Sequence, residues 1–168
     1  MAEARDLFGY NSWQFTDGTD VTANSFVDAW NYAVANAQLG AYFFEPIKGY
    51  AEEGVEELEG LEVIDDKTFK VTMNAPTADF PQRLGYSAFA PLPESAFDDM
   101  DAFGENPVGN GPYKLEEWNH NSNALLVPNP DYPGDHAAQN DGLDIVFYPS
   151  QDAAYAALLS GNLDVLDQ

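Results

Sequence analysis

The residues that could do chemistry in this chain lie apart from the partners that catalysis requires. The nearest match to a nucleophile elbow is Gly85-Tyr-Ser-Ala-Phe89, which lacks the second glycine of that motif. His120 and His136 lie in polar segments with no histidine or cysteine at ligand spacing, so both are expected to be exposed loop residues. Paired carboxylates for glycoside hydrolysis give no signal among 29 acidic residues. The sequence therefore predicts no catalytic residue and no enzyme.

Cofactor and metal sites are not predicted either. The chain has no phosphate-binding GxxxxGK[ST] run, and Gly109-Asn-Gly111 is followed by a proline, which has no backbone N–H to offer a phosphate. Four aspartates could surround a calcium ion: Asp131, Asp135, Asp141 and Asp144. Their spacing matches no EF-hand loop, so no metal is expected. Because cysteine is absent, disulfides, thiolate nucleophiles and cysteine-based zinc sites are excluded.

Charge narrows the range of partners. The formal net charge is −23, from 29 Asp and Glu against 6 Lys and Arg, and it would repel nucleic acids and anionic membrane surfaces. We interpret the acidity as a solvated surface that keeps an exported or salt-exposed protein soluble. No apolar run approaches the length of a membrane span, and residues 1–10 lack the basic start and apolar stretch of a leader. If the native protein is exported, its targeting segment is expected to lie outside this sequence.

The first half of the chain predicts one helix and one hairpin. A turn at residues 17–20 precedes Thr22, a helix-capping residue type, and an apolar helical face follows: Phe26, Trp30, Ala33, Val34 and Ala37. This helix is expected to end near Gly40, before the aromatic segment 41–46 and an acidic surface loop at 51–60. From Leu61 apolar residues alternate around a turn at Asp65-Asp66, which predicts a β-hairpin with one buried face.

The second half predicts short helices and strands. Prolines at 76 and 93 indicate helices over residues 77–84 and 94–100. Strands are predicted from residue 113 and over 124–127, around a polar turn at 119–123. A strand over 143–148, a helix over 152–160 and a strand over 163–166 would form a βαβ-like unit. Four aromatic residues are assigned to the core: Trp30, Phe69, Tyr113 and Trp118. The expected fold class is α/β.

Three ordered segments carry a resemblance to a known family. The first is Phe15-Thr-Asp-Gly-Thr-Asp-Val-Thr-Ala23, which runs into the predicted helix, and the second is Val63-Ile-Asp-Asp-Lys-Thr-Phe69. The third is Asn106-Pro-Val-Gly-Asn-Gly-Pro-Tyr-Lys-Leu115, in which Asn110 stands where a threonine is usual. Together they resemble the family 5 extracellular solute-binding proteins, which include oligopeptide, dipeptide and nickel-binding receptors of ABC importers. The likeness spans nearly the whole chain.

The resemblance implies a fold and a role. It implies part of a type II periplasmic-binding-protein-like lobe, with a mixed sheet, hairpins and packing helices. Residues 13–128 would form the small subdomain of the N-terminal lobe, and residues 129–168 would begin the return into the main lobe and hinge. The implied protein is a monomeric, extracytoplasmic receptor, periplasmic or lipid-anchored through a missing N-terminal anchor. It would bind oligopeptides between two lobes and deliver them to the transmembrane subunits of an ABC permease.

One residue of the resemblance is a candidate ligand contact. The aromatic run Tyr42-Phe-Phe44 resembles a segment that approaches the cleft in oligopeptide receptors, so Tyr42 is the predicted ligand-binding residue. The competing interpretation is that the run only fills the core between helix and hairpin. Within the family, a sugar, a nickel complex or a signalling peptide could replace nutritional peptides. From a different class, an acidic, aromatic-rich domain could be a carbohydrate-binding module or an accessory domain of a secreted glycosidase.

Overall fold

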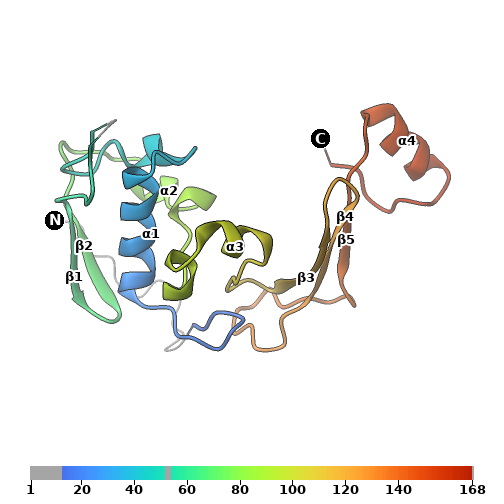
Figure 1. The fold of residues 1–168 in the computed structure, drawn as a ribbon, viewed down its shortest axis with the longest axis horizontal. Helices are drawn as coiled ribbons and strands as arrows, with labels where there is room; N and C mark the ends of the chain where they lie inside the picture. The colour runs from blue at the N-terminus through green and yellow to red at the C-terminus, as the bar shows by residue number, and fades with distance from the viewer. Residues whose placement is uncertain (1–12, 52–53, 168) are drawn as a thin grey trace. The chain divides into compact units, whose positions relative to one another are not determined.

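The computed structural model describes residues 13–51 and 54–167, so the prediction for residues 1–10 lies outside the described residues. Contacts group the described residues into two compact units, one of residues 13–110 with 131–133 and one of residues 111–130 with 134–167. The first unit contains α1 (Ala23–Ala35), η1 (Ala41–Phe44), β1 (Leu61–Asp65), β2 (Thr68–Val71), α2 (Phe80–Arg83), η2 (Ser87–Phe89), η3 (Glu94–Phe97) and α3 (Met100–Glu105), where η marks a 3-10 helix (Figure 1). The second contains β3 (Tyr113–Asn119), β4 (Asn123–Pro128), β5 (Leu143–Val146) and α4 (Gln151–Leu159).

Helix α1 begins as the sequence predicts and ends earlier. Thr22 has extended backbone, and its N–H donates to the Ser25 hydroxyl at 3.1 Å, which caps the helix. The predicted end near Gly40 is wrong, because Ala37 adopts a left-handed φ of 47°. The N–H of Gln38 then donates to Ala33 O at 2.9 Å, which closes the last turn. A C-terminal turn of this kind usually uses glycine, so an alanine at this position carries no signal for it.

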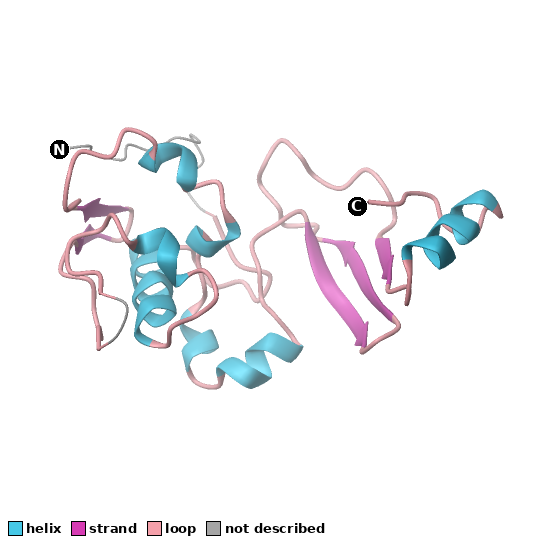
Figure 2. Ribbon diagram, turned by 90° about the horizontal axis from the view of Figure 1, so that it is seen from above, coloured by secondary structure: helices cyan, strands magenta, loops and turns pink. Residues whose placement is uncertain are grey.

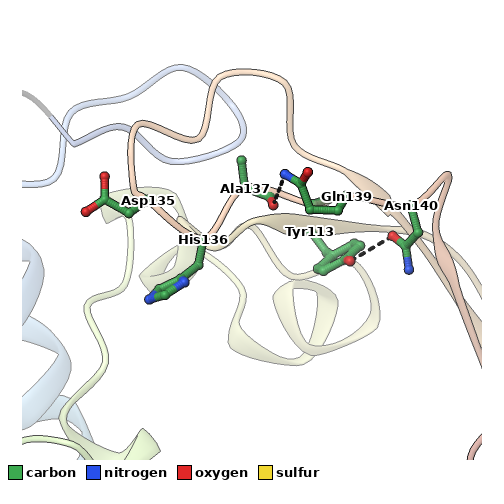
Figure 3. Close-up of a pocket in the computed structure, with 7 residues that line it drawn as sticks. Tyr113, Asp135, His136, Ala137, Gln139 and Asn140 are labelled. Carbon is green, nitrogen blue, oxygen red and sulfur yellow. Dashed lines mark hydrogen bonds between the residues drawn. The ribbon is translucent and has the colours of Figure 1, made fainter.

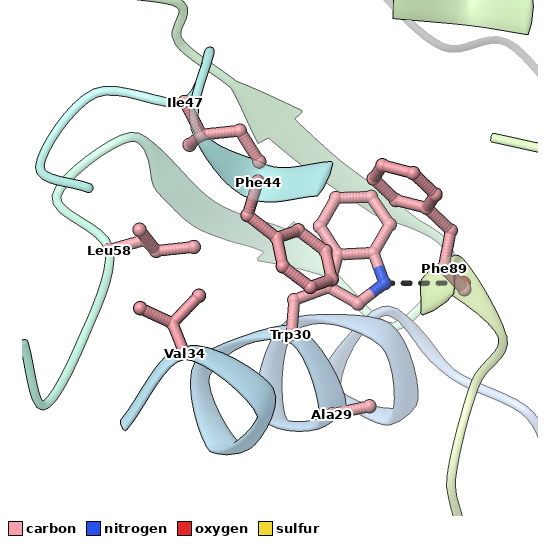
Figure 4. Close-up of a cluster of buried hydrophobic side chains, with 7 residues drawn as sticks. All are labelled: Ala29, Trp30, Val34, Phe44, Ile47, Leu58 and Phe89. Carbon is pink, nitrogen blue, oxygen red and sulfur yellow. Dashed lines mark hydrogen bonds between the residues drawn. The ribbon is translucent and has the colours of Figure 1, made fainter. Parts of the chain in front are cut away.

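The core of the first unit is aromatic and centres on Trp30. Trp30 is 2% exposed, and its indole N–H donates to Phe89 O at 3.2 Å (Figure 4). The Trp30 ring lies 5.7 Å from Phe44 and 5.2 Å from Phe89, both of which are buried. Leu58 is also buried, so the acidic segment 51–60 is not wholly a surface loop. These contacts join α1 to η1 and η2 through one packed cluster.

The predicted hairpin is confirmed. β1 pairs antiparallel with β2, with Leu61 opposite Val71 and Val63 opposite Phe69, and the hairpin lies along α1 (Figure 1). Phe69 packs inward, with its ring 5.3 Å from the Trp30 ring and stacked on Phe26 at 5.8 Å. Alternation therefore predicted the face that packs against the helix, although Val63 on that face remains partly exposed.

The short helices lie close to their predicted positions, with different starts. α2 covers only Phe80–Arg83 and has Pro81 in its first turn, so the helix start inferred from Pro76 is wrong. Pro93 precedes η3 as predicted, but η3 ends at Phe97 and a separate helix, α3, begins at Met100. Asp99 divides the two because its extended backbone and carboxylate cap α3, accepting from Ala102 N–H at 3.0 Å.

The second unit is a three-stranded antiparallel sheet in the order β3-β4-β5, followed by α4 (Figure 2). The β3-β4 hairpin confirms the predicted strands. The prediction of a βαβ-like unit is wrong, because β5 runs antiparallel to β4 and residues 163–166 are not a strand. A strand requires a neighbour for its backbone hydrogen bonds, and none of the described residues supplies one for that segment.

Two of the four residues predicted as core differ from expectation. Trp118 is 39% exposed, with its ring 4.3 Å from the His120 ring on the β3-β4 hairpin, so its assignment to the core is wrong. Tyr113 is half-buried, and its hydroxyl donates to Asn140 at 2.8 Å. Both lie in the small sheet, where the described residues include few buried side chains that could cover an aromatic ring.

Carboxylates dominate the surface, and the described ion pairs are few and exposed. Lys48 pairs with Glu59 at 3.1 Å, Lys70 with Glu62 at 2.7 Å and Arg83 with Asp79 at 2.8 Å. Elsewhere carboxylates lie near one another. Burial raises the pKa of Asp28 on α1, and the negative charges of the nearby Glu94 and Glu57 raise this pKa further. The ionised form of Asp28 is therefore disfavoured in the folded chain.

Replacing Asp28 with asparagine is expected to stabilise the chain at neutral pH by at most about 0.5 kcal/mol, since the side chain is largely exposed. Because its pKa is raised, the Asp28 carboxyl holds its proton more tightly in the folded chain than in the unfolded chain. The stability gained from this protonation is complete at pH values below the unfolded pKa, and it is lost as pH rises through the raised folded pKa. Urea unfolding should therefore show a gain at neutral pH that disappears near about pH 3. Asp98→Asn, at an exposed position, is the control, and an equal gain at both pH values would contradict the account.

Candidate functional site

An exposed aromatic surface forms where η1 meets the segment between α2 and η2. Tyr42 is 61% exposed and Tyr86 is 58% exposed. The half-buried ring of Phe43 contacts both, stacked on Tyr42 with centroids 4.5 Å apart and tilted against Tyr86 at 4.7 Å. We call these three residues, Tyr42, Phe43 and Tyr86, the aromatic surface. It presents two large amphipathic rings to solvent on a packed support.

The local sequence explains why Tyr42 faces outward. A 3-10 turn has three residues, so the side chains of Tyr42, Phe43 and Phe44 project in different directions. Phe44 is 0% exposed and fixes the inner side of η1 against Trp30. Gly40 lets η1 approach η2 closely, because a Cβ at that position would lie 3.0 Å from the Cβ of Ala88. This close approach brings the Tyr86 ring next to Phe43.

Polar side chains complete a shallow depression of about 460 Å³ beside these rings. Besides the aromatic surface it is lined by Glu45, Asp79, Gln82 and Arg83. The Arg83 Nε donates to Asp79 at 2.8 Å, one helical turn away, and this hydrogen bond holds the pKa of Asp79 below its usual value. The depression thus combines exposed rings with charged and amide groups, a composition that suits organic ligands with both apolar and polar parts.

The three residues of the aromatic run lie in different environments. Phe44 fills the core, whereas Tyr42 reaches solvent and Phe43 lies between these two environments. The predicted ligand contact of Tyr42 stays a prediction. Tyr86 and Arg83 were missed, because their segment was assigned only to a short helix and its end. A signal was present in the run Arg83-Leu-Gly-Tyr86, in which a flexible glycine precedes an aromatic residue outside any regular element.

A second depression lies within the sheet unit, between Tyr113 and the loop of residues 135–140 (Figure 3). The Tyr113 side chain is directed at Asn140, whose side-chain oxygen accepts a hydrogen bond from the Tyr113 hydroxyl, and the Gln139 side-chain N–H donates to the Ala137 carbonyl at 3.1 Å. These two hydrogen bonds hold the loop together and occupy the Tyr113 hydroxyl, the Asn140 side-chain oxygen and a Gln139 N–H.

The described side chains do not form a cluster suited to a metal ion. Within residues 13–51 and 54–167, no group of three or more His, Asp or Glu side chains could hold one. His120 and His136 are both exposed, as the sequence predicts. In the part of the chain that the structure describes, no helix has the length and apolar character needed to cross a bilayer.

Comparison with known proteins identifies the class and then the family. The model of the bacterial extracellular solute-binding proteins, family 5 middle, matches residues 12–168. The fold is that of the periplasmic-binding-protein-like peptide binders, which confirms the predicted α/β fold class. The chain therefore has the architecture found in extracellular solute-binding proteins, and it belongs to family 5 of these proteins. This family consists of binding proteins.

Individual relatives are similar over most of the chain. The oligopeptide-binding protein OppA of Bacillus subtilis is 28% identical over 161 residues, covering 90% of this chain and 30% of the relative. The unliganded open form of the periplasmic murein tripeptide binding protein MppA matches with a TM-score of 0.82 and 24% identity, covering 92% of this chain and 32% of that chain. Haemophilus influenzae OppA in complex with RPPGFSPFR matches with a TM-score of 0.78 and 26% identity, over 90% of this chain and 32% of that chain. The chain thus spans about a third of their length.

Proposed function

We propose that this chain is part of the substrate-binding component of an ABC-type peptide importer. The observation that carries the proposal is the family 5 match over residues 12–168, together with relatives named for oligopeptide or tripeptide binding. In this role the protein captures oligopeptides outside the cytoplasm and passes them to the transmembrane subunits of a permease. It acts as a monomer, held at the membrane by a lipid anchor or free in the periplasm, and it has no catalytic activity.

The carbohydrate-binding alternative has less support. Exposed aromatic rings suit sugars as well as peptides, but the family match and the named relatives favour peptides. The aromatic surface lies beside an arginine, two carboxylates and a carboxamide, and such groups suit the charged and amide groups of a peptide.

The sheet unit supports a role as one part of a larger lobe. β5 has a strand neighbour on one side only among the described residues, and its side chains are exposed on both faces, including Leu143, Ile145 and Val146. Exposed contiguous apolar residues on a strand indicate a surface that further polypeptide covers. We therefore propose that polypeptide outside this sequence completes the sheet. The division into residues 13–128 and 129–168 stays a prediction. This division would separate β4 from β5, which pair in one sheet, so the pairing favours a boundary nearer Gly111.

Within this receptor we propose that Tyr42 contacts the ligand. It is the most exposed ring of the aromatic surface, and stacking on Phe43 restricts its motion before a ligand arrives. A ring that is already restrained loses little conformational entropy on binding, so its burial against a peptide contributes efficiently to affinity. A second surface from the remaining lobe would enclose the ligand and exclude water.

Replacing Tyr42 with alanine in the complete gene product should weaken peptide binding by up to about tenfold, since an aromatic contact contributes about 0.5–1.5 kcal/mol. Isothermal titration calorimetry with alanine-based tri- to pentapeptides measures this. Tyr42→Phe should retain most of the affinity. Leu39→Ala is the matched control, because Leu39 is 97% exposed on the same segment and does not line the depression. Equal affinities for Tyr42→Ala and Leu39→Ala would rule out the contact, and absence of peptide binding by the unmodified protein would overturn the proposed function.

A further inference from the structure

The charges around the aromatic surface do not cancel. Asp79 and Arg83 form a pair, with the guanidinium Nε donating to the carboxylate at 2.8 Å. Glu45, which lines the same depression, is exposed, and its carboxylate has no hydrogen bond or ion pair with any other described residue. The depression therefore has two carboxylates and one guanidinium, and the unpaired charge is negative.

The position of Glu45 is fixed although its side chain is free. It follows Phe44 directly, its N–H donates to Tyr42 O at 3.2 Å, and its carbonyl accepts from the Asn74 side chain at 3.4 Å. The neighbouring Phe44 and Ile47 are both 0% exposed and anchor the segment in the core. The backbone of Glu45 is thus anchored beside that of Tyr42, so binding of a partner by the carboxylate orders only the Glu45 side chain.

The exposed tyrosine rings also attract cations, as the Glu45 carboxylate does. The face of a tyrosine ring carries negative electrostatic potential, and a cation placed over it is stabilised. Tyr42 and Tyr86 both present ring surface to solvent within the depression that Glu45 lines. A carboxylate next to aromatic faces is the arrangement that holds an ammonium or guanidinium group. At long range, the formal charge of −23 also concentrates cations near the protein.

We propose that the depression at the aromatic surface takes a positively charged group of the ligand, an alkylammonium or a guanidinium, through Glu45 and the rings of Tyr42 and Tyr86. This inference rests on the proposed function and adds a preference for cationic peptides. Two parts of a peptide could provide the group: a lysine or arginine side chain, or the free amino terminus. An acidic group is disfavoured, because Asp79 already occupies the Nε edge of Arg83 and Glu45 repels anions.

The test compares alanine tetrapeptides in which one position carries lysine, glutamine or glutamate, by calorimetry on the complete gene product. A lysine peptide should bind about fivefold more tightly than the matched glutamine peptide, as one exposed cation–π contact with one exposed ion pair allows. Glutamate peptides should bind most weakly. Forms of each peptide acetylated at the amino terminus distinguish the sources. Equal affinities of the free lysine and glutamine peptides, both lowered by acetylation, assign the site to the amino terminus, whereas a lysine preference that acetylation leaves in place assigns the site to the side chain.

Variants test the assignment to Glu45. Glu45→Gln should bring the lysine and glutamine peptides to equal affinity, whereas Glu56→Gln, an equal change of charge at an exposed position outside the depression, should keep the preference. Unmodified protein that binds all the peptides with the same affinity, free or acetylated, would overturn this inference and leave the proposed function intact. Binding of no peptide at all would overturn the proposed function itself. A preference that survives Glu45→Gln would also overturn the assignment.

Discussion

Replacing Trp30 with alanine is expected to lower the free energy of unfolding by about 3–5 kcal/mol, a large part of the stability of a domain of this size. Trp30 is 2% exposed and contacts Phe44, Phe69 and Phe89. Its loss would leave a cavity between α1, the hairpin and η2. It would also leave the Phe89 carbonyl without the indole N–H that it accepts at 3.2 Å.

Urea unfolding followed by circular dichroism measures this effect. Trp30→Phe keeps an aromatic ring but removes the indole N–H, so it should cost less than alanine, about 1–3 kcal/mol. Trp118→Ala is the control, because Trp118 is 39% exposed and should cost about 1 kcal/mol or less. Equal losses for Trp30→Ala and Trp118→Ala would show that the Trp30 cluster is not the main core of the chain.

Raising the salt concentration is expected to stabilise the fold. Adding NaCl from about 0.1 M to 1 M shortens the Debye length from about 10 Å to about 3 Å. Like charges that are neighbours cost a few tenths of a kcal/mol each, so screening several such contacts should contribute about 2 kcal/mol, or a rise in Tm of roughly 5 °C. The excess of 29 acidic over 6 basic residues makes repulsion the larger effect.

Differential scanning calorimetry over a series of NaCl concentrations tests this expectation. At about pH 4, where part of the carboxylates are protonated, the rise in Tm should be smaller. Screening also weakens attractive pairs, among them Lys70 with Glu62 at 2.7 Å. A Tm that falls as NaCl is added would mean that these ion pairs outweigh the repulsion, which would contradict the interpretation of the acidity as a salt-exposed surface.

Local patterns predicted the elements whose side chains meet their own neighbours in sequence. The hairpin β1-β2 followed from alternation around Asp65-Asp66, and the start of α1 followed from Thr22. In both cases the controlling interactions join residues of one short stretch of sequence, such as the bond from Thr22 N–H to Ser25. Periodicity and capping rules describe such contacts directly.

Elements that depend on distant residues were predicted less well. The end of α1 is set by a left-handed Ala37, a conformation that alanine adopts only where packing requires it. Residues 163–166 have the composition of a strand but lack a pairing partner among the described residues. Composition identifies a segment able to pair, and only the tertiary structure shows whether a partner is present.

The candidate site shows the same division. Tyr42 could be proposed because its segment resembles part of the family, whereas Tyr86 lies 44 positions later by residue number and is brought to Phe43 by the close approach of η1 and η2. Glu45 gave no signal among 29 acidic residues. Its distinction is structural, since it is the carboxylate of the depression that has no partner among the described residues.

We propose that this chain belongs to a receptor that captures peptides. Native mass spectrometry of the complete gene product, purified without denaturation and then acidified to release what it holds, tests this proposal. We predict that the mass of the native protein exceeds its sequence mass by that of a short peptide, and that tandem sequencing of the released material reads peptide sequences containing lysine or arginine. Release of a saccharide in place of peptide would contradict the account.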